Sequence, residues 1–448
     1  MSFPRYPSYK DSGVEWLGAV PEHWDYKSIK RCTYLKGRVG WKGLTSEEYL
    51  DEGYAYLVTG TDFSAKFISW SDCHCVDEGR YADDPFIQLV NGDLLITKDG
   101  TIGKLALVSG LDRPACLNSG IFLLRPQDSY TTAFMYWVLS SNPFRVFCDL
   151  ASLGSTIQHL YQNVFERFIF PVPTSAEQTQ VAAFLDRETA KIDELVAEQR
   201  RLMELLKEKR QAVISHAVTQ GLNPDAPMKP SDIEWLGDVP AHWEVMSLRR
   251  CASSVQTGGT PSTEPPSTDL VEGLVWFTPG DFSDSLFLTN STRKIASEVV
   301  ASGEAKVFPP RSVLIVSIGA TLGKVGFAEQ ASSANQQINA VIPNERVDGY
   351  FLAYSLLVKA EVMRFLSNAS TIGIMNQEKT KDIWLAVPPT VEQIDIAGFL
   401  DTETAKLDTL TAEAQRAIDL LQERRTALIS AAVTGQIDVR ALTEREVA

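Results

Sequence analysis

Two glycine-rich runs that end in lysine are the first places where this sequence could bind a phosphate. Gly100 to Lys104 reads GTIGK, and Gly319 to Lys324 reads GATLGK. A phosphate-binding loop needs four residues between its glycines and a serine or threonine after its lysine, because backbone amides and that hydroxyl hold the phosphates and the magnesium ion. Leu105 and Val325 stand after the two lysines. Both runs are therefore predicted to be turns between strands.

Other patterns that would support catalysis are incomplete. A metal-dependent nuclease needs two acidic ligands followed by a lysine, but the run from Asp93 to Lys98 has Ile96 in place of the second acid. Cys73-His74-Cys75 is too closely spaced for a zinc finger, and no second ligand pair follows it. None of the Pro-Pro pairs follows an Asn or Asp and precedes an aromatic residue, as adenine methylation would require. The chain is predicted to be no enzyme and to hold no metal or cofactor.

Length and composition set wider limits. A chain of 448 residues is long enough for about three folded units. Its net charge of −15 argues against a protein that binds nucleic acid over its whole surface. No apolar stretch approaches the roughly 18 residues of a membrane span, and the start lacks a signal peptide pattern, so a cytoplasmic location is expected. Only Gly258 to Thr268 has a composition typical of disorder.

An internal duplication organises the chain. Glu15 to Cys32 matches Glu234 to Cys251 at a shift of 219, with 11 of 18 residues identical. Glu177 to Thr219 matches Glu392 to Thr434 at a shift of 215, with 25 of 43 identical. Between these blocks the likeness is confined to short runs such as TIGK and TLGK. The two copies are predicted to share a scaffold and to differ in the residues built on it.

The second matched block is predicted to be helical in both copies, because apolar residues recur at steps of three and four. Charged residues interrupt this seam at Glu188, Lys209, Glu403 and Arg424. At about 1.5 Å per residue each helix would be roughly 60 Å long, and the two are expected to pair in an antiparallel coiled coil. The predicted pairing residues are Leu185, Ile192, Leu195, Leu202, Leu206 and Val213 in the first helix and Leu400, Leu407, Leu410, Leu421 and Leu428 in the second.

The rest of the chain carries short β-like runs separated by turn residues, which is typical of mixed α/β (α+β) globules. The predicted order is a first globule over 1–173, a helix over 174–222, a second globule over 223–388, a helix over 389–437 and a tail over 438–448. His23 and His242 lie in a repeated PxHW run and, like Trp24 and Trp243, are expected to pack rather than to react.

The repeated EWLGxVPxHW run, the TIGK and TLGK turns, the STI runs and the VPxxxEQ helix start together resemble the specificity subunit of type I restriction-modification systems. The resemblance covers nearly the whole chain. It implies a non-catalytic subunit whose two target-recognition domains each read half of a split double-stranded DNA site, with the helices setting their separation. It also implies two methyltransferase subunits and restriction subunits as partners, which would bring S-adenosylmethionine, ATP and Mg.

An antiparallel pair of helices would relate the two globules by a pseudo-twofold axis, which is also the symmetry of duplex DNA. A rod of roughly 60 Å exceeds the roughly 34 Å of one duplex turn, so the globules could address successive major grooves. Because the globules differ in sequence, the two half-sites should differ and the whole site should be asymmetric.

Polar residues beside the matched turns are the predicted DNA contacts, because Asn and Gln can bond adenine and Lys can approach guanine or phosphate. They are Lys98, Thr101, Lys104, Ser155, Thr156 and Gln158 in the first globule and Ser317, Thr321, Lys324, Asn335, Gln336, Ser370, Thr371, Asn376 and Gln377 in the second. The alternative for each is a structural turn residue. For the whole chain, the alternative is a duplicated coiled-coil scaffold that binds proteins without DNA.

Overall fold

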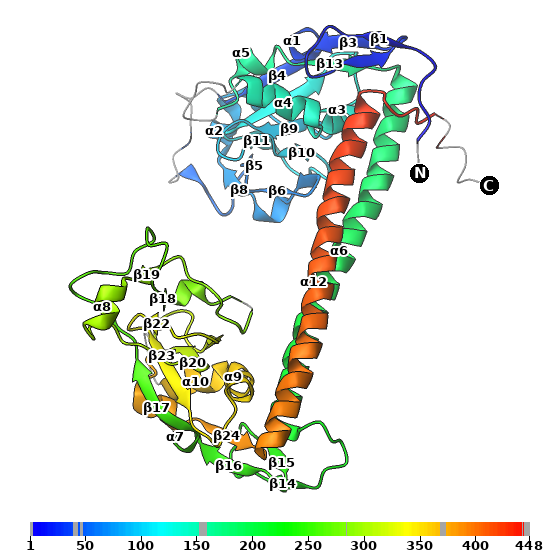
Figure 1. Ribbon diagram of the computed structural model, residues 1–448. Helices are drawn as coiled ribbons and strands as arrows, with labels where there is room; N and C mark the ends of the chain where they lie inside the picture. Colours follow the sequence, from blue (N-terminus) through cyan, green and yellow to red (C-terminus); the bar gives the residue numbers. More distant parts are fainter. Residues whose placement is uncertain are drawn as a thin grey trace. The chain divides into compact units, whose positions relative to one another are not determined.

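The computed structural model describes residues 3–38, 44, 48–151, 159–283, 285–367, 373–440 and 442. It divides into two compact units. Unit 1 contains residues 1–199 and 416–448, and unit 2 contains residues 200–415. Each unit therefore combines one globule with parts of both long helices (Figure 1).

The globule of unit 1 is built on a six-stranded sheet of order β4-β12-β9-β10-β7-β6. The first four strands of this order are antiparallel neighbours, and β10 pairs with β7 in parallel. β9 is buried along its whole length, so this sheet forms the middle of the core. The strands of the unit are β1 (Tyr9–Asp11), β2 (Ala19–Pro21), β3 (Asp25–Ser28), β4 (Thr33–Gly37), β5 (Ala55–Val58), β6 (Phe63–Ser64), β7 (Phe67–Ile68), β8 (His74–Val76), β9 (Leu94–Thr97), β10 (Leu105–Leu107), β11 (Ala115–Leu117), β12 (Ile121–Pro126) and β13 (Ile169–Val172). The short helices are α1 (Ile29–Cys32), α2 (Glu78–Ala82), α3 (Thr132–Leu139), α4 (Asn142–Ala151) and α5 (Gln162–Phe165).

Unit 2 repeats the first four strands of this order as a four-stranded sheet, β17-β23-β20-β21. The smaller pairings β3-β13 and β1-β2 recur as β16-β24 and β14-β15. Its strands are β14 (Met228–Pro230), β15 (Asp238–Pro240), β16 (Glu244–Ser247), β17 (Ala252–Thr257), β18 (Leu274–Phe277), β19 (Lys294–Ile295), β20 (Ser312–Val316), β21 (Val325–Ala328), β22 (Ser333–Ala334), β23 (Ile338–Pro343) and β24 (Trp384–Val387). Its short helices are α7 (Leu248–Cys251), α8 (Ser297–Ala301), α9 (Gly349–Leu357), α10 (Ala360–Ser367) and α11 (Gln377–Lys381).

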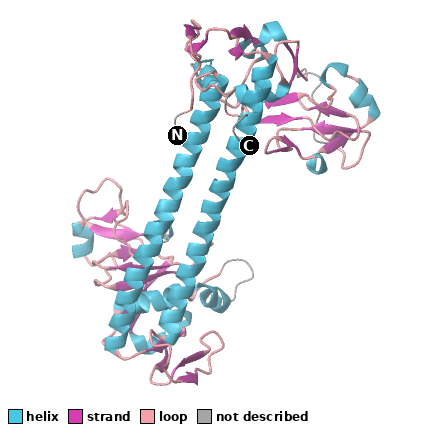
Figure 2. Cartoon of the chain, turned by 90° about the vertical axis from the view of Figure 1, so that its right-hand side faces the viewer, coloured by secondary structure: helices cyan, strands magenta, loops and turns pink. Residues whose placement is uncertain are grey.

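The two long helices are α6 (Ser175–Gln220) and α12 (Thr390–Val433). In unit 1, Trp24 Nε1 donates to Glu177 in the first turn of α6, and Gly435, just after α12, lies against the same tryptophan ring. The start of α6 and the end of α12 therefore meet, and the segments of this unit run antiparallel. Both views show the helix segments of each unit side by side (Figures 1 and 2).

An arginine–aspartate ion pair is found between the helix segments in each unit. Arg425 Nε lies 3.0 Å from Asp193 Oδ1 in unit 1, and Arg210 Nε lies 3.4 Å from Asp408 Oδ1 in unit 2. A shift of 215 relates the two arginines and also the two aspartates. The duplication thus extends to the charged contacts between the helices.

The buried stripe of each long helix differs from the predicted seam at every second step. Leu195 and Leu202 are 44% and 42% exposed, whereas Val196 is buried. In α12, Leu410 is 46% exposed, whereas Ile418 is buried. The prediction that these three leucines pair the helices is therefore corrected.

The cause is an ambiguity in the repeat. Counted from Leu185, the predicted steps of three and then four fit a coiled-coil repeat, and so do the observed steps of four and then three. With the corrected register, the predicted charged interruptions at 188 and 403 move to Thr189 and Thr404, which are both buried. Of the other predicted pairing residues, Val213 and Leu421 are half-buried and the rest are buried, namely Leu185, Ile192, Leu206, Leu400, Leu407 and Leu428.

The segment from Gly258 to Thr268 is built into unit 2, contrary to the expectation from its composition. Gly259 N donates to Ala334 O, and Ser267 pairs with Lys294 in both directions. The Glu304 carboxylate accepts hydrogen bonds from the backbone amides of Ser262 and Thr263. Backbone and carboxylate partners outside the segment therefore supply the order that its composition lacks.

Candidate nucleic-acid interface

The matched sequence blocks meet where each globule joins the start of a long helix. In unit 1, Glu177 Oε1 lies 2.9 Å from His23 Nε2 and 3.3 Å from Trp24 Nε1, and Glu177 Oε2 accepts a hydrogen bond from the Thr174 hydroxyl at 2.8 Å. Burial of the Glu177 carboxyl raises its pKa, but the hydrogen bonds from these three residues outweigh burial and lower the pKa below its usual value. Glu177 therefore fixes the helix to the globule as a carboxylate.

Unit 2 has the same junction. Glu392 lies 2.8 Å from His242 Nε2 and accepts a hydrogen bond from Trp243 Nε1 at 3.1 Å. Trp24 and Trp243 are both fully buried. The repeated PxHW run thus supplies a histidine and a tryptophan to one glutamate in each unit, which gives both globules the same attachment to the helices.

The glycine-rich run of unit 1 is the hairpin turn between β9 and β10. Gly103 N donates to Thr97 O at 3.0 Å, and the Thr97 hydroxyl accepts from Lys104 N at 3.0 Å. Gly100 and Gly103 have φ of +69° and +86°, values that favour glycine. The turn exposes Thr101 and Lys104.

The same turn joins β20 to β21 in unit 2. Gly323 N donates to Val316 O at 2.9 Å, as Gly103 does to Thr97. Thr321 is half-buried and Lys324 is exposed, and the Lys324 ammonium donates to Phe282 O at 2.8 Å. The two runs are therefore equivalent turns between strands.

Two of the predicted contacts in unit 2 are buried. The Ser317 hydroxyl donates to Gln337 O at 2.9 Å, and Asn335 Nδ2 donates to Gln337 Oε1 at 3.1 Å. Because these groups are occupied inside the unit, Ser317 and Asn335 hold the turn in place and do not offer a base-reading group at the surface.

The other described candidates of unit 2 lie nearer the surface. Gln336 is exposed and accepts a hydrogen bond from the Thr260 hydroxyl at 3.1 Å. Asn376 is exposed but caps α11 by accepting from Lys379 N. The half-buried Gln377 amide is 3.1 Å from the Thr257 hydroxyl. Of the remaining predictions, Ser155, Thr156, Gln158, Ser370 and Thr371 lie outside the described residues.

The prediction missed a charged group beside the unit 1 turn. Lys98 was a candidate, but its partner Asp99 and the nearby His159 were not. His159 Nδ1 lies 2.7 Å from Asp99 Oδ1, and Lys98 Nζ lies 3.1 Å from Asp99 Oδ2. A signal was present, because the shifts of 219 and 215 align Asp99 with Ile318 and His159 with Ile374, two changes from a charged or polar residue to an apolar one.

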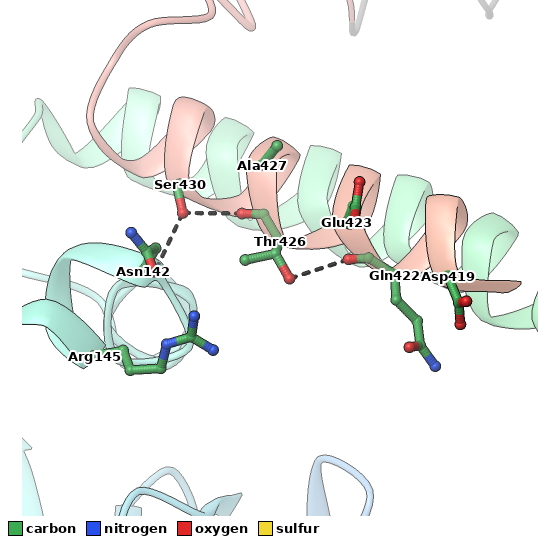
Figure 3. Close-up of a pocket in the computed structure, with 8 residues that line it drawn as sticks. All are labelled: Asn142, Arg145, Asp419, Gln422, Glu423, Thr426, Ala427 and Ser430. Atoms are coloured by element: carbon green, nitrogen blue, oxygen red, sulfur yellow. Dashed lines mark hydrogen bonds between the residues drawn. The ribbon is translucent and has the colours of Figure 1, made fainter. Parts of the chain in front are cut away.

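A polar groove of about 570 Å³ lies in unit 1 between α4 and the end of α12 (Figure 3). Asn142 N, at the start of α4, donates to the Ser430 hydroxyl of α12 at 3.1 Å. Arg145 from one side and Asp419 and Glu423 from the other add charge. This lining suits hydrogen bonding to another polar surface and lacks a nucleophile with its base.

The described part of the chain offers no metal site, reactive thiol pair or membrane-spanning helix. No cluster of three His, Cys, Asp or Glu residues there could hold a metal ion. Cys73 and Cys75 flank His74 but are both buried free thiols. None of the described helices combines the length and the apolar character needed to cross a membrane.

Comparison with known proteins identifies the scaffold. The family model for the type I restriction modification DNA specificity domain matches residues 45–203 and 240–419, which is more than half of the chain and one match for each copy of the repeat. The chain belongs to the type I restriction-modification specificity family. It is accordingly a DNA-recognition subunit and not an enzyme.

Curated relatives extend this match along most of the chain. The type I restriction enzyme MjaX specificity subunit of Methanocaldococcus jannaschii is 21% identical over 95% of this chain and 96% of its own length. The EcoBI specificity subunit of Escherichia coli is 22% identical over 77% of this chain and 73% of its own.

Two solved structures share the fold at 16% identity. One, from work on complex assembly and conformational transition of the type I R-M system, has a TM-score of 0.74 and covers 93% of this chain and 99% of its own. The other is the HsdS subunit from Thermoanaerobacter tengcongensis, with a TM-score of 0.55 and coverage of 93% and 98%. The predicted fold class of two mixed α/β domains with long helices is thereby confirmed.

Proposed function

We propose that this specificity subunit reads a bipartite, asymmetric DNA site, with one half-site contacted by each unit. The observation that carries the proposal is the contrast between shared and unshared parts. The units repeat their sheet order, their glutamate junctions and the backbone of their hairpin turns. They differ in side chains beside those turns, where unit 1 has Asp99 and His159 and unit 2 has Ile318 and Ile374. A common frame with different surface groups suits two readers that hold equivalent positions and recognise different bases.

We further propose that the subunit docks two adenine methyltransferase subunits and, through them, restriction subunits. Exposed leucines recur at the shift of 215, as Leu195 with Leu410 and Leu205 with Leu420. A repeated apolar surface suits two copies of one partner. S-adenosylmethionine, ATP and Mg would then be bound by those partners, and the assembly would act in the cytoplasm.

The net charge of −15 supports a role for partners in DNA binding. Phosphate neutralisation by Lys and Arg supplies much of the affinity of proteins for DNA, and this chain has 42 of those residues against 57 acidic ones. We expect the complex with the methyltransferase subunits to bind DNA more tightly, and with a steeper salt dependence, than the chain alone. Equal affinity and equal salt slope with and without the partners would contradict this part of the proposal.

Exchange of one globule tests the division of labour. Residues 1–173 are replaced by the equivalent globule of another specificity subunit, and the methylated sequences of a host carrying each version are determined. We expect one half of the methylated site to change and the other half to stay the same. A change in both halves, or in neither, would show that the units do not read separate half-sites.

A further inference from the structure

Lys98, Asp99 and His159 form a charged cluster beside the hairpin turn of unit 1. Asp99 accepts hydrogen bonds from both neighbours, at 3.1 Å from Lys98 Nζ and 2.7 Å from His159 Nδ1. The side chains of Lys98, Asp99 and His159 are 21%, 35% and 39% exposed. The Tyr161 ring, which is 60% exposed, has its centroid 6.0 Å from the His159 ring. All four side chains therefore reach the surface close together.

The backbone that carries this cluster is present in both units. Lys98 N donates to Gly120 O in unit 1, as Ser317 N donates to Gln337 O in unit 2. Leu160 N donates to Lys98 O, as Met375 N donates to Ser317 O. In unit 2, however, Ile318 and Ile374, which pair through a β-bridge, take the places of Asp99 and His159. The turn thus forms without the charged cluster, so the fold of the turn does not require it.

The hydrogen bond to Asp99 determines how the His159 ring can act. With Nδ1 donating to the carboxylate, Nε2 is the nitrogen that can accept from a base edge or, in the protonated ring, donate to one. Burial of the Asp99 carboxyl raises its pKa, but hydrogen bonds from His159 and Lys98 outweigh burial and lower the pKa below its usual value. Asp99 therefore remains a carboxylate and positions the side chains of Lys98 and His159.

We propose that His159, positioned by Asp99 beside Lys98, contacts a base pair in the half-site read by unit 1. The inference rests on the proposed function, and it names a specificity-determining residue for that function. A group that is exposed, oriented by a second side chain, dispensable for the turn and different in the other copy has the properties expected of a base-reading residue. Unit 2 cannot make the same contact, because isoleucine has no hydrogen-bonding group.

Binding by the assembled complex with its methyltransferase subunits tests the proposal. The probes are duplexes that carry the methylated target sequence and every single-base-pair change in either half. Wild type is compared with His159→Gln, with Asp99→Asn and with the control His216→Gln, which changes an exposed histidine on α6. We expect His159→Gln to weaken binding to the target between about fivefold and a hundredfold. Discrimination should fall at one or two base pairs of one half only.

The remaining outcomes distinguish failure of the His159 contact from failure of the proposed function. Asp99→Asn should relax the same base pairs as His159→Gln, and His216→Gln should behave as wild type. Unchanged discrimination by His159→Gln, a uniform loss over all sequences, or a lower unfolding temperature that accounts for the loss would overturn the role of His159. If wild type itself shows no preference among the duplexes, the proposed function fails instead.

Discussion

Units 1 and 2 have the same framework and different surfaces, and one such difference lies beside the equivalent hairpin turns. In both units a glycine-rich hairpin follows a fully buried strand, β9 or β20, and uses equivalent backbone hydrogen bonds. In unit 1 this turn lies beside Asp99 and His159, and in unit 2 beside Ile318 and Ile374. Buried strands and junctions constrain their residues through packing and hydrogen bonding, whereas an exposed turn tolerates change. Recognition can therefore diverge without loss of the scaffold.

The largest expected effect tests whether the helices are equivalent in the two units. Leu185 and Leu400 are both fully buried and related by the shift of 215. We expect Leu185→Ala and Leu400→Ala each to lower the free energy of unfolding of its own unit by ~2–5 kcal/mol, because each leaves a cavity. Denaturant unfolding combined with hydrogen exchange in each unit measures this.

Leu195→Ala and Leu410→Ala are the matched controls, because these leucines are exposed and each precedes the corrected seam by one residue. Each should lower the free energy of unfolding by less than ~1 kcal/mol. Losses at the control positions as large as those at Leu185 and Leu400 would restore the seam predicted from the sequence.

A buried lysine distinguishes unit 2 from unit 1. Burial lowers the pKa of Lys359 to about 8, whereas the position matched at the shift of 215 holds Phe144 in unit 1. The folded pKa lies below the unfolded value of ~10.4, so the free energy of unfolding should rise as pH increases from about 8 towards ~10.4.

Lys359→Met should therefore raise the free energy of unfolding at pH 7 by ~3 kcal/mol and remove this pH dependence. Chemical denaturation of both proteins between pH 7 and 10 is the measurement. Lys406→Met on the exposed face of α12 is the control, and it should keep the wild-type pH profile. If Lys359→Met kept the wild-type pH dependence of stability, buried Lys359 would not be its source.

The junction glutamates provide a test within the shared framework. The Glu177 side chain is 6% exposed, and that of Glu392 is 28% exposed. We expect Glu177→Gln to cost ~1–3 kcal/mol of unfolding free energy and Glu392→Gln to cost less, because the loss of a charge-assisted hydrogen bond matters more where water is excluded.

The pH dependence of the same stabilisation has a definite sign. The folded pKa of Glu177 lies below its usual value, so its contribution is complete above an unfolded pKa of ~4.3 and is lost as pH falls through the folded pKa. Thermal unfolding between pH 3 and 7 would show this loss in wild type and its absence in Glu177→Gln. Equal costs for the two glutamates would refute the role of burial.

The smallest expected effect concerns the ion pairs between the helices. Arg425–Asp193 and Arg210–Asp408 are both partly exposed. Removing either arginine's charge with Arg425→Gln or Arg210→Gln should cost ~0.2–1 kcal/mol, and the loss should shrink as salt is added. A double-mutant cycle with Asp193→Asn or Asp408→Asn measures the coupling. A salt-independent loss above ~2 kcal/mol would mean that the pair acts as a buried contact.

The sequence alone determined the duplication, the two long helices, the glycine turns and the family resemblance. Each of these depends on a repeated pattern or on short-range chemistry. Gly100 and Gly319, for example, adopt the positive φ that tight turns require. The absence of complete catalytic motifs was also readable, because such motifs depend on residue type and close spacing.

Only the tertiary structure decided which side chains face outward and which residues meet. Counted from Leu185, both orders of three-residue and four-residue steps fit a coiled-coil repeat, so the sequence does not distinguish Leu195 from Val196 as the seam residue. Burial against neighbouring elements shows that it is Val196. Ser317 and Gln336 are equally polar in the sequence, but only one of them is exposed. Asp99 and His159 are separated by 60 positions and come together because β9 and the segment before α5 lie side by side. Long-range packing sets such contacts, and a local pattern does not record them.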